Sequence, residues 1–252
     1  MDSVVSGFAS VSIYKIFKQK YLILTNTTIE PNGDTSIQRP VDCSSRPVVV
    51  HLIMKILSAL LYDQAFTQEQ IPDLELPRVA VFGRSNVGKS SLLAAMMNRK
   101  KLVKVSSTPG KTRAIFFYIV NGQYFLVDLP GYGFSRAPRS LSRNWHSLVE
   151  AYLDSGSGPT LALHLIDIRH PPTKEDLAVR QILRERGIPA VVVTTKADKL
   201  SKAGRIKSIA VIAREMSVRA DSIVPVSIKD PSISVAAVWE RITSILETSS
   251  DV

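Results

Sequence analysis

From residue 78 onward, short apolar runs alternate along the chain with longer segments whose apolar residues recur at helical spacing. Short apolar runs bounded by turn residues indicate buried strands, and apolar positions three and four residues apart indicate amphipathic helices. The runs that predict strands are 79–82, 114–120, 123–128, 161–167, 190–194 and 223–226. The segments that predict helices are 91–97, 145–152, 174–186, 203–216 and 235–247. This alternation predicts an α/β fold.

The dipeptide Asn121-Gly122 indicates the relative direction of two of these strands. It separates the runs 114–120 and 123–128, and Asn-Gly between two β-rich runs is a strong hairpin signal. We therefore expect these two strands to be antiparallel neighbours. Helical segments join the other strands, and helical crossovers connect parallel strands. The prediction is a six-stranded, mostly parallel sheet with one antiparallel strand and helices on both faces.

Residues 1–65 do not share this alternation, and we assign them to an N-terminal extension of unknown role, with 66–252 as the α/β domain. Within the extension, 48–61 fits one amphipathic helix or a strand followed by a helix. The first 25 residues carry a single acidic residue, as organellar transit segments do, but such segments are also rich in arginine and none precedes Arg39. Organellar targeting by residues 1–40, a lineage-specific extension and a mistaken start codon all stay open.

Composition restricts the class of protein further. At 252 residues, of which 45% are apolar and 21% charged, the chain is long enough for one well-buried domain and an appendage. Cys43 is the only cysteine, which excludes a disulfide framework and fits a reducing compartment. No uninterrupted apolar run of about 18 residues occurs, so we expect no transmembrane helix and no membrane partner. We expect a cytoplasmic monomer.

The net charge of +10 is unevenly distributed. Residues 1–77 hold six Lys/Arg and eight Asp/Glu, whereas 78–252 hold 26 and 14, a balance of +12. The basic excess therefore belongs to the α/β domain. It predicts attraction to a polyanion if the charges share a face, and a generally solvated basic surface if they do not.

The most informative motif is the run from Gly83 to Ser90, which fits the phosphate-binding pattern G-x-x-x-x-G-K-[ST]. It follows a predicted strand and precedes a predicted helix, which is the context that phosphate binding needs. Backbone N–H groups of such a loop surround the phosphates, and the helix N-terminus adds its positive end. Lys89 is expected to reach the β- and γ-phosphates, and Ser90 to bind Mg²⁺. We predict a nucleoside triphosphate site here.

Asp128 ends another predicted strand and begins the motif Asp-x-x-Gly, which closes with Gly131. A carboxylate at this position typically helps to organise Mg²⁺ through a bound water. The N–H of Gly131 can approach the γ-phosphate because no Cβ intervenes, so this segment can report whether that phosphate is present. Thr112 is the candidate first-switch threonine that completes Mg²⁺ coordination, and Thr108 is a competitor that spacing alone does not exclude.

The segment Thr195-Lys196-Ala197-Asp198 follows a strand about 105 residues after the phosphate loop and is the candidate base-recognition motif. Asp198 can accept hydrogen bonds from N1–H and N2–H₂ of guanine, whereas adenine would leave the carboxylate unpaired. Lys196 is expected to cover the base plane, and Ser227, after the last strand, to close the pocket. An ATP-using P-loop kinase is the alternative, which Asp198 and the lack of lid-like arginines disfavour.

These stretches together resemble the translation-factor-like GTPases and, within them, the EngB (YihA/YsxC) family. The resemblance covers about 77–247. Its motifs are the phosphate loop 83–91, 106–112, Asp128-Leu129-Pro130-Gly131-Tyr132-Gly133-Phe134, the run Asp167 to Pro172, and 195–200. It implies a Ras-like fold, GTP and GDP as ligands, Mg²⁺ as cofactor, slow GTP hydrolysis, and a role in large ribosomal subunit assembly with a link to cell division. It also favours Thr112 over Thr108.

The resemblance gives each expected site residue a role. The catalytic residues are Lys89, Thr112 and Gly131, and the metal ligands are Ser90 and Thr112. The expected nucleotide-contacting residues are Gly83, Arg84, Ser85, Asn86, Val87, Gly88, Lys89, Ser90, Gly110, Lys111, Thr112, Arg113, Ala114, Asp128, Leu129, Pro130, Gly131, Thr195, Lys196, Ala197, Asp198, Val226, Ser227 and Ile228. Asn86 matches the position at which related GTPases coordinate K⁺, so K⁺ is a second expected cation.

Two further expectations concern rate and partner. Ras-type enzymes place a water-orienting Gln directly after Asp-x-x-Gly; here Tyr132 stands there and offers no amide, so hydrolysis should be slow. The expected partner is the large ribosomal subunit or its rRNA. The basic residues expected to contact it are Arg99, Lys100, Lys101, Lys104, Arg136, Arg139 and Arg143. The alternative is a regulatory GTPase with a protein effector in cell division and no RNA contact.

Overall fold

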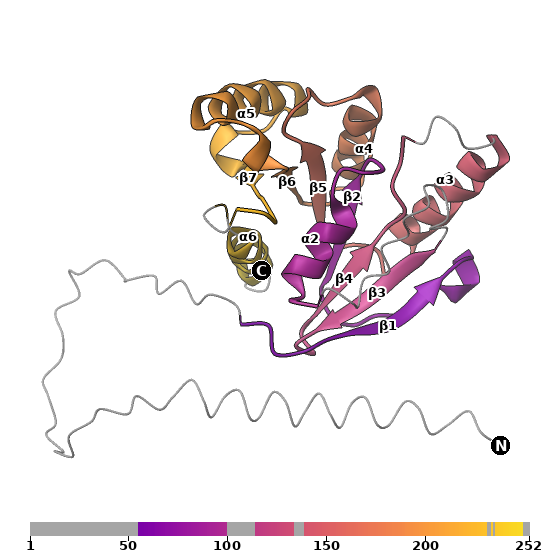
Figure 1. Ribbon diagram of the computed structural model, residues 1–252. Helices are drawn as coiled ribbons and strands as arrows, with labels where there is room; N and C mark the ends of the chain where they lie inside the picture. Colours follow the sequence, from indigo (N-terminus) through magenta and orange to yellow (C-terminus); the bar gives the residue numbers. More distant parts are fainter. Residues whose placement is uncertain (1–54, 100–113, 134–138, 231–232, 234, 249–252) are drawn as a thin grey trace, which may run out of the picture. The chain divides into compact units, whose positions relative to one another are not determined.

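A seven-stranded sheet forms the centre of the described chain, in the order β1-β3-β4-β2-β5-β6-β7 (Figure 1). This computed structural model describes residues 55–99, 114–133, 139–230, 233 and 235–248, except for the side chains of 139–146. The strands are β1 (Ala59–Ala65), β2 (Arg78–Gly83), β3 (Ile115–Val120), β4 (Tyr124–Asp128), β5 (Leu161–Asp167), β6 (Ala190–Thr195) and β7 (Val224–Pro225).

Only β3 runs against the other strands of this sheet. It is antiparallel to both of its neighbours, β1 and β4, while the contacts from β4 through β2, β5 and β6 to β7 are all parallel. The expected hairpin is confirmed, with Val120 paired to Tyr124 across the turn and Asn121 in the left-handed region at φ 52°. The predicted mostly parallel α/β sheet with one antiparallel strand is therefore correct.

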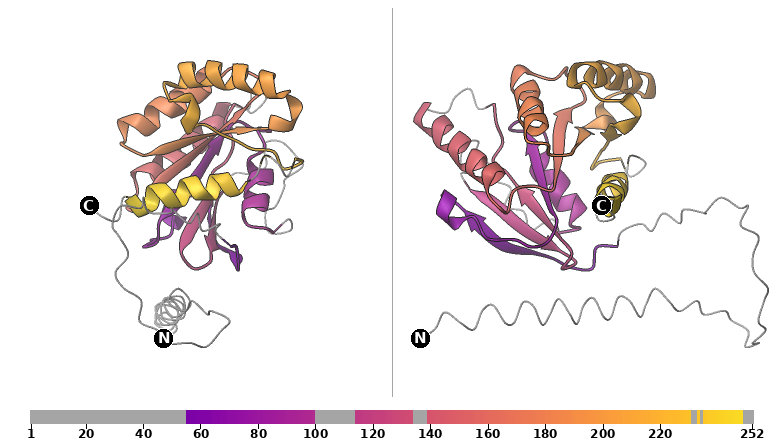
Figure 2. Two further views of the ribbon diagram at one scale, coloured as in Figure 1. Left: turned by 90° about the vertical axis from the view of Figure 1, so that its left-hand side faces the viewer. Right: turned by 180° about the vertical axis from the view of Figure 1, so that it is seen from behind.

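Within the described residues, five α-helices cover the two faces of the sheet (Figure 2). They are α2 (Lys89–Met96), α3 (Arg139–Asp154), α4 (Lys174–Glu185), α5 (Lys202–Met216) and α6 (Ala236–Thr248). Side chains alternate between the faces because successive residues of a strand point in opposite directions. Val79 and Val81 of β2 pack with α2 and α6, whereas Ala80 and Phe82 pack with α3 and α4. Burial on both faces explains why the strands are almost continuously apolar.

The sheet contains one strand more than predicted. Ala59–Ala65, which we had placed in the N-terminal extension, forms the edge strand β1 and pairs with β3 from Ala59↔Val120 to Ala65↔Ile115. Both alternatives for 48–61 ended in a helix at residue 61, and both are wrong there because residues 59–61 are part of β1. Five of the seven residues of β1 are exposed, so the strand has no alternation for a sequence pattern to reveal, and its pairing partner lies about 60 residues further along. Organellar targeting by residues 1–40 stays a prediction, because these residues lie outside the described residues.

Asn121, in the hairpin turn, ties the start of β1 to the sheet. Its side-chain oxygen accepts hydrogen bonds from the N–H groups of Leu57 and Ser58, at 2.8 and 3.1 Å. Its amide nitrogen donates to the carbonyl oxygen of Lys55 at 2.9 Å. The turn residue thus satisfies three backbone groups of a segment more than 60 residues away in the sequence.

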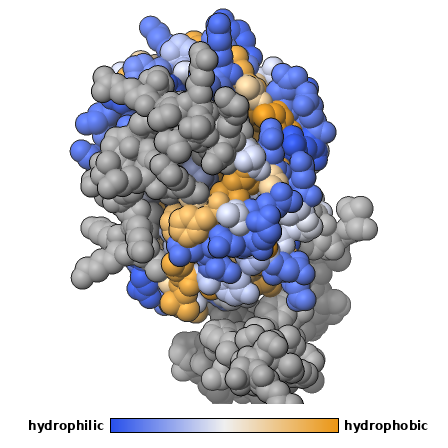
Figure 3. All heavy atoms as spheres, turned by 90° about the vertical axis from the view of Figure 1, so that its right-hand side faces the viewer, coloured by the Kyte–Doolittle hydropathy of each residue, from blue (hydrophilic) through white to orange (hydrophobic). Residues whose placement is uncertain are grey.

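The outer strand β1 and the residues beside it expose apolar side chains. Leu60 and Tyr62 lie in β1 and Phe66 directly after it, each with more than half of its surface exposed. Figure 3, which views the face at the right of Figure 1, shows apolar side chains gathered among hydrophilic ones. None of the helices in the described part of the chain combines the length and the apolar character that crossing a bilayer requires.

Candidate functional site

The motifs that the sequence singled out lie at the carboxyl ends of neighbouring parallel strands. The phosphate loop follows β2, Asp128 ends β4, Thr195 ends β6, and Val226 follows β7. These strands share the order β4-β2-β5-β6-β7 and one direction, so their carboxyl ends meet at one edge of the sheet. Ligands of open α/β sheets bind at that edge.

The loop between Gly83 and Lys89 turns the chain from β2 into α2. Two residues adopt left-handed backbone conformations, Asn86 at φ 64° and Gly88 at φ 111°. Gly88 is the N-cap of α2, and its carbonyl oxygen accepts the first helical hydrogen bond from Leu92 at 2.9 Å. The buried Val87 side chain anchors the loop in the core. This geometry directs first-turn N–H groups of α2 toward the loop, where they can bind an anion.

Lys89 and Asp128 form an ion pair at the base of this loop. Lys89 Nζ lies 2.6 Å from Asp128 Oδ1, and the two side chains are only 11% and 6% exposed. An ammonium carries three donors, so Lys89 can contact phosphate oxygens while Asp128 orients it. The carboxylate of Asp128 and the hydroxyl of Ser90, the second residue of α2, are both oxygen donors, which is the ligand type that Mg²⁺ prefers. The residues present therefore fit a Mg²⁺ site.

The Asp128–Gly131 segment lies directly against the phosphate loop. Ser85 donates its backbone N–H to the carbonyl oxygen of Tyr132 at 2.9 Å, and Tyr132 donates its own to Gly83 at 3.4 Å. A Cβ on Gly131 would lie only 3.0 Å from the backbone nitrogen of Ser85. Because the two segments are this close, a shift of Gly131 toward Ser85 would displace the phosphate loop.

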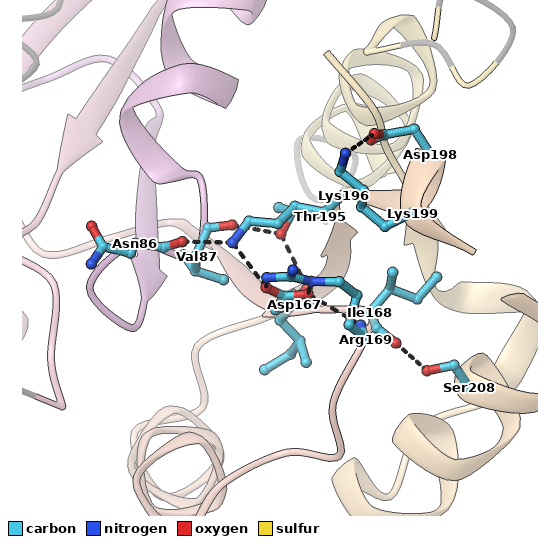
Figure 4. A network of polar contacts seen from close by, with 11 residues as sticks. Asn86, Val87, Asp167, Ile168, Arg169, Thr195, Lys196, Asp198, Lys199 and Ser208 are labelled. Carbon is cyan, nitrogen blue, oxygen red and sulfur yellow. Dashed lines mark hydrogen bonds and ion pairs between the residues drawn. The ribbon is translucent and has the colours of Figure 1, made fainter. Parts of the chain in front are cut away.

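The Thr195–Asp198 segment is also joined to the phosphate loop (Figure 4). Thr195 Oγ1 donates to the carbonyl oxygen of Val87 at 2.6 Å, and Lys196 Nζ donates to that of Asn86 at 2.8 Å. Lys196 Nζ also lies 2.9 Å from a carboxylate oxygen of Asp167, at the end of β5. These contacts fix the base-recognition segment relative to the phosphate loop.

Asp198 faces the segment that follows β7. Its Oδ1 accepts a hydrogen bond from Ser227 Oγ at 2.8 Å, and this bond lowers the pKa of the Asp198 carboxyl below its usual value. Ser227 is buried and its hydroxyl also accepts from the N–H groups of Lys229 and Asp230. Val226 is buried beside it, whereas Ile228 is 55% exposed. The expected pocket-closing residue thus orients the expected base-reading residue.

Several expected site residues lie outside the described residues. They are Thr108, Gly110, Lys111, Thr112 and Arg113, so the choice of first-switch threonine stays a prediction. Ala114, which follows them, is buried next to β3. Of the expected basic surface, Arg99 is exposed after α2. The other members lie in 100–113 and 134–138 or among the side chains of 139–146, so their arrangement also stays a prediction.

Asp167 and Arg169 belong to the site, although the sequence reasoning gave them no role. Arg169 makes a two-pronged ion pair with Asp167, with Nε–Oδ1 at 2.9 Å and Nη2–Oδ2 at 2.7 Å. Burial alone would raise the pKa of Asp167, but hydrogen bonds from Arg169 and Lys196 outweigh it and hold that pKa far below its ordinary value. Ser208 of α5 bonds the carbonyl oxygen of Ile168 between them. The sequence signals were the position of Asp167 at a strand end and the place of both residues in the family motif from Asp167 to Pro172, neither of which indicated their partners.

A strand–loop–helix phosphate site joined to an Asp-x-x-Gly segment and a Thr-Lys-x-Asp segment defines a P-loop GTPase. Residues 78–196 match the family described as "50S ribosome-binding GTPase". The chain belongs to the EngB family of GTP-binding proteins. It is 46% identical over 163 residues to the "Probable GTP-binding protein EngB" of Syntrophomonas wolfei, and this covers 65% of the chain and 84% of that protein.

Further comparisons agree with this family. The "Probable GTP-binding protein EngB" of Bacillus cytotoxicus is 35% identical over 197 residues, covering 78% of the chain and all of that protein. A crystal structure of a probable GTP-binding protein EngB superimposes with a TM-score of 0.57 at 25% identity, covering 68% of the chain and 99% of that structure. The family confirms the GTPase class expected from the sequence.

Proposed function

We propose that the chain is a Mg²⁺-dependent GTP switch with slow hydrolysis that acts in assembly of the large ribosomal subunit and is needed for normal cell division. The observation that carries the switch is the contact of Gly131 with Ser85, because it makes the Asp-x-x-Gly segment sensitive to what the phosphate loop holds. The ends of β2, β4, β6 and β7 supply the remaining parts of the site.

Each candidate residue has a role in this proposal. The N–H groups of the phosphate loop and Lys89 bind the phosphates, Asp198 and Ser227 read guanine, and Lys196 covers the base. Ser90 and Asp128 hold Mg²⁺, directly and through water respectively. Mg²⁺ bound there neutralises charge on the phosphate oxygens. Gly131 presents its N–H to the γ-phosphate, which GDP lacks, so its position distinguishes the two nucleotides.

Slow hydrolysis follows in this proposal from Tyr132. The position after Asp-x-x-Gly carries a phenol whose hydroxyl is buried and bonded to Asp176, so it has no free amide or hydroxyl with which to orient an attacking water. K⁺ at the Asn86 side chain is proposed to supply part of the transition-state charge stabilisation. The Asn86 carbonyl oxygen already accepts from Lys196, whereas its side chain is exposed.

The large ribosomal subunit is the proposed partner on two grounds. The family that matches residues 78–196 is described as 50S ribosome-binding. The part of the chain from residue 78 onward also carries a balance of +12, which favours RNA over a neutral protein surface.

Co-sedimentation with large-subunit particles tests this proposal. The full chain is incubated with particles in the presence of a GTP analogue, GDP or no nucleotide, at two salt concentrations. We expect more chain to pellet with the GTP analogue and less at high salt, because phosphate contacts weaken steeply with salt. Arg99→Glu should weaken pelleting more than Arg214→Glu, an identical charge change at an exposed position of α5. Equal pelleting in all nucleotide states and salts would contradict the proposal.

A second candidate function is a regulatory GTPase with a protein effector in division. The observation that favours it is the exposed apolar surface of β1, where Leu60 is 63% and Tyr62 52% exposed. Salt-insensitive recovery of a division protein with the GTP-bound chain, without pelleting on ribosomal particles, would support this candidate over the first.

A further inference from the structure

Three polar side chains from three different elements meet inside the protein behind the phosphate loop. Tyr132 directly follows Gly131, His164 lies in β5, and Asp176 lies in the first turn of α4. They are 6%, 0% and 4% exposed. The Tyr132 hydroxyl donates to Asp176 Oδ1 at 2.7 Å and lies 2.9 Å from His164 Nε2. Buried polar groups are retained where hydrogen bonds satisfy them, and such a network specifies one geometry.

Asp176 cannot turn away from Tyr132 because a helix cap holds it. Thr173 is the N-cap of α4, and both its backbone N–H and its hydroxyl donate to Asp176 Oδ2 at 2.8 Å. In return, the Asp176 N–H donates to Thr173 Oγ1 at 3.4 Å. The negative carboxylate also lies at the positive end of the helix dipole. One oxygen of Asp176 therefore serves the cap, and the other is left for the phenol.

Proton counting assigns the tautomer of His164. The phenol has one hydrogen, which goes to Asp176, so His164 must donate from Nε2 to the phenol oxygen. The other ring nitrogen, Nδ1, has no hydrogen-bond partner among the described residues, which suits a bare lone pair better than an N–H. Burial lowers the pKa of His164 to about 4, and burial together with Asp176 raises that of Tyr132. His164 and Tyr132 are therefore both uncharged at neutral pH.

The main chain of Tyr132 connects this network to the nucleotide site. Its N–H and carbonyl oxygen bond to Gly83 and Ser85 on the phosphate loop, while its side chain is held by β5 and α4. A residue held at both ends also determines the location of the peptide before it. Gly131 supplies the carbonyl half of that peptide and lies against Ser85, so its position, and with it the position of its own N–H, is limited as well.

We propose that Tyr132 is a positioning residue for GTP hydrolysis, anchored through its hydroxyl by His164 and Asp176 so that the Gly131 N–H stays at the γ-phosphate position. This inference rests on the proposed role of Gly131. Tyr132 acts through Gly131 and not on the attacking water, because its hydroxyl is directed into the protein. The network also joins the start of α4 to the nucleotide site.

Tyr132→Phe tests this role because it removes only the hydroxyl. We expect kcat for GTP hydrolysis by the full chain to fall about tenfold, the GTP-analogue affinity to fall relative to GDP, and the GDP affinity to stay within about twofold. Thr173→Val, which removes the hydroxyl contacts with Asp176 but keeps the backbone N–H bond and does not touch Tyr132, should change both quantities in the same direction by a smaller factor. A purely structural role of Tyr132 would not alter the ratio of the two affinities.

Tyr152→Phe is the matched control. Tyr152 is fully buried in the same apolar cluster as Tyr132, but its hydroxyl has no hydrogen-bond partner among the described residues, so its loss should leave hydrolysis unchanged. The proposal is overturned if Tyr132→Phe hydrolyses GTP within about twofold of the unsubstituted chain, or if Tyr152→Phe loses as much. Gly131→Ala distinguishes a failure of the positioning role of Tyr132 from a failure of the proposed role of Gly131. If it loses activity while Tyr132→Phe does not, the positioning role alone fails; if neither does, the role of Gly131 fails as well.

Discussion

Replacing Gly131 by Ala probes the contact between the Asp-x-x-Gly segment and the phosphate loop. The added Cβ would lie 3.0 Å from the Ser85 nitrogen and 3.1 Å from its Cα and Oγ, whereas ordinary contacts begin near 3.4 Å. Two of these atoms are backbone, so the segments must separate by a few tenths of an ångström, and overpacking of this kind costs about 1–3 kcal/mol of stability. The Gly131 N–H would then lose the hydrogen bond proposed for it with the γ-phosphate. Such a bond to a charged group is worth about 1.5–3 kcal/mol, so the hydrolysis rate should fall about 10- to 150-fold.

A glycine on another part of the chain controls for the loss of stability. Gly158, between α3 and β5, lies near the amino ends of the strands, and a Cβ there would lie 2.9 Å from the Leu153 carbonyl oxygen. Gly158→Ala should lose stability comparably in urea unfolding yet hydrolyse GTP normally in a single-turnover assay. The reasoning is refuted if Gly131→Ala keeps its rate within about twofold, or if the two variants lose activity in parallel with stability.

Three further predictions concern neighbouring residues. Asp167→Asn removes the charge that pairs with Lys196, so the affinities for GDP and GTP should both fall several-fold in fluorescence titrations; a change in only one of them would contradict a role in base binding. If K⁺ binds at Asn86, GTP hydrolysis should be faster in KCl than in NaCl at equal ionic strength, and Asn86→Asp should change this difference; equal rates in both salts would refute the K⁺ role. Because burial lowers the pKa of His164 from 6.5 to about 4, the unfolded chain takes up this proton first as the pH falls. The His164 contribution to stability should therefore be complete above pH 6.5 and decline toward pH 4, by at most about 1.4 kcal/mol per pH unit. Urea unfolding of His164→Gln at several pH values should lack this component, and parallel curves for the two proteins would contradict the assignment.

Local patterns were sufficient for most of the sheet and its helices. The strands from β2 to β7 are almost continuously apolar because both faces are covered, and Asn121-Gly122 predicts the only antiparallel hairpin among them. Strand β1 could not be found in this way. Its side chains are mostly exposed, and it is held by pairing with β3 and by the side chain of Asn121, contacts that depend on residues distant in the sequence.

In the candidate site, too, the sequence revealed the local motifs but not the contacts between residues that are distant in the chain. The motifs at Gly83–Ser90, Asp128–Gly131 and Thr195–Asp198 were readable because phosphate and guanine each require particular groups at fixed local spacing. The hydrogen bonds between those groups and the rest of the site could not be read from local spacing. The sequence placed Ser227 at the base pocket but not as the partner of Asp198, 29 residues before it, and it gave no role to Asp167, which holds Lys196 across 29 residues.

The sequence by itself determined the phosphate-loop, Asp-x-x-Gly and Thr-Lys-x-Asp motifs, because each is a short run whose chemistry is local; sensing of the γ-phosphate and reading of guanine are the roles proposed for the last two. Only the tertiary structure decided what Tyr132 does. Its place after Gly131 indicated merely the absence of a glutamine, whereas folding brings His164 and Asp176 to its hydroxyl from 32 and 44 residues away. Burial then makes those hydrogen bonds costly to break, since an unpaired polar group in the protein interior has no water to replace its partner.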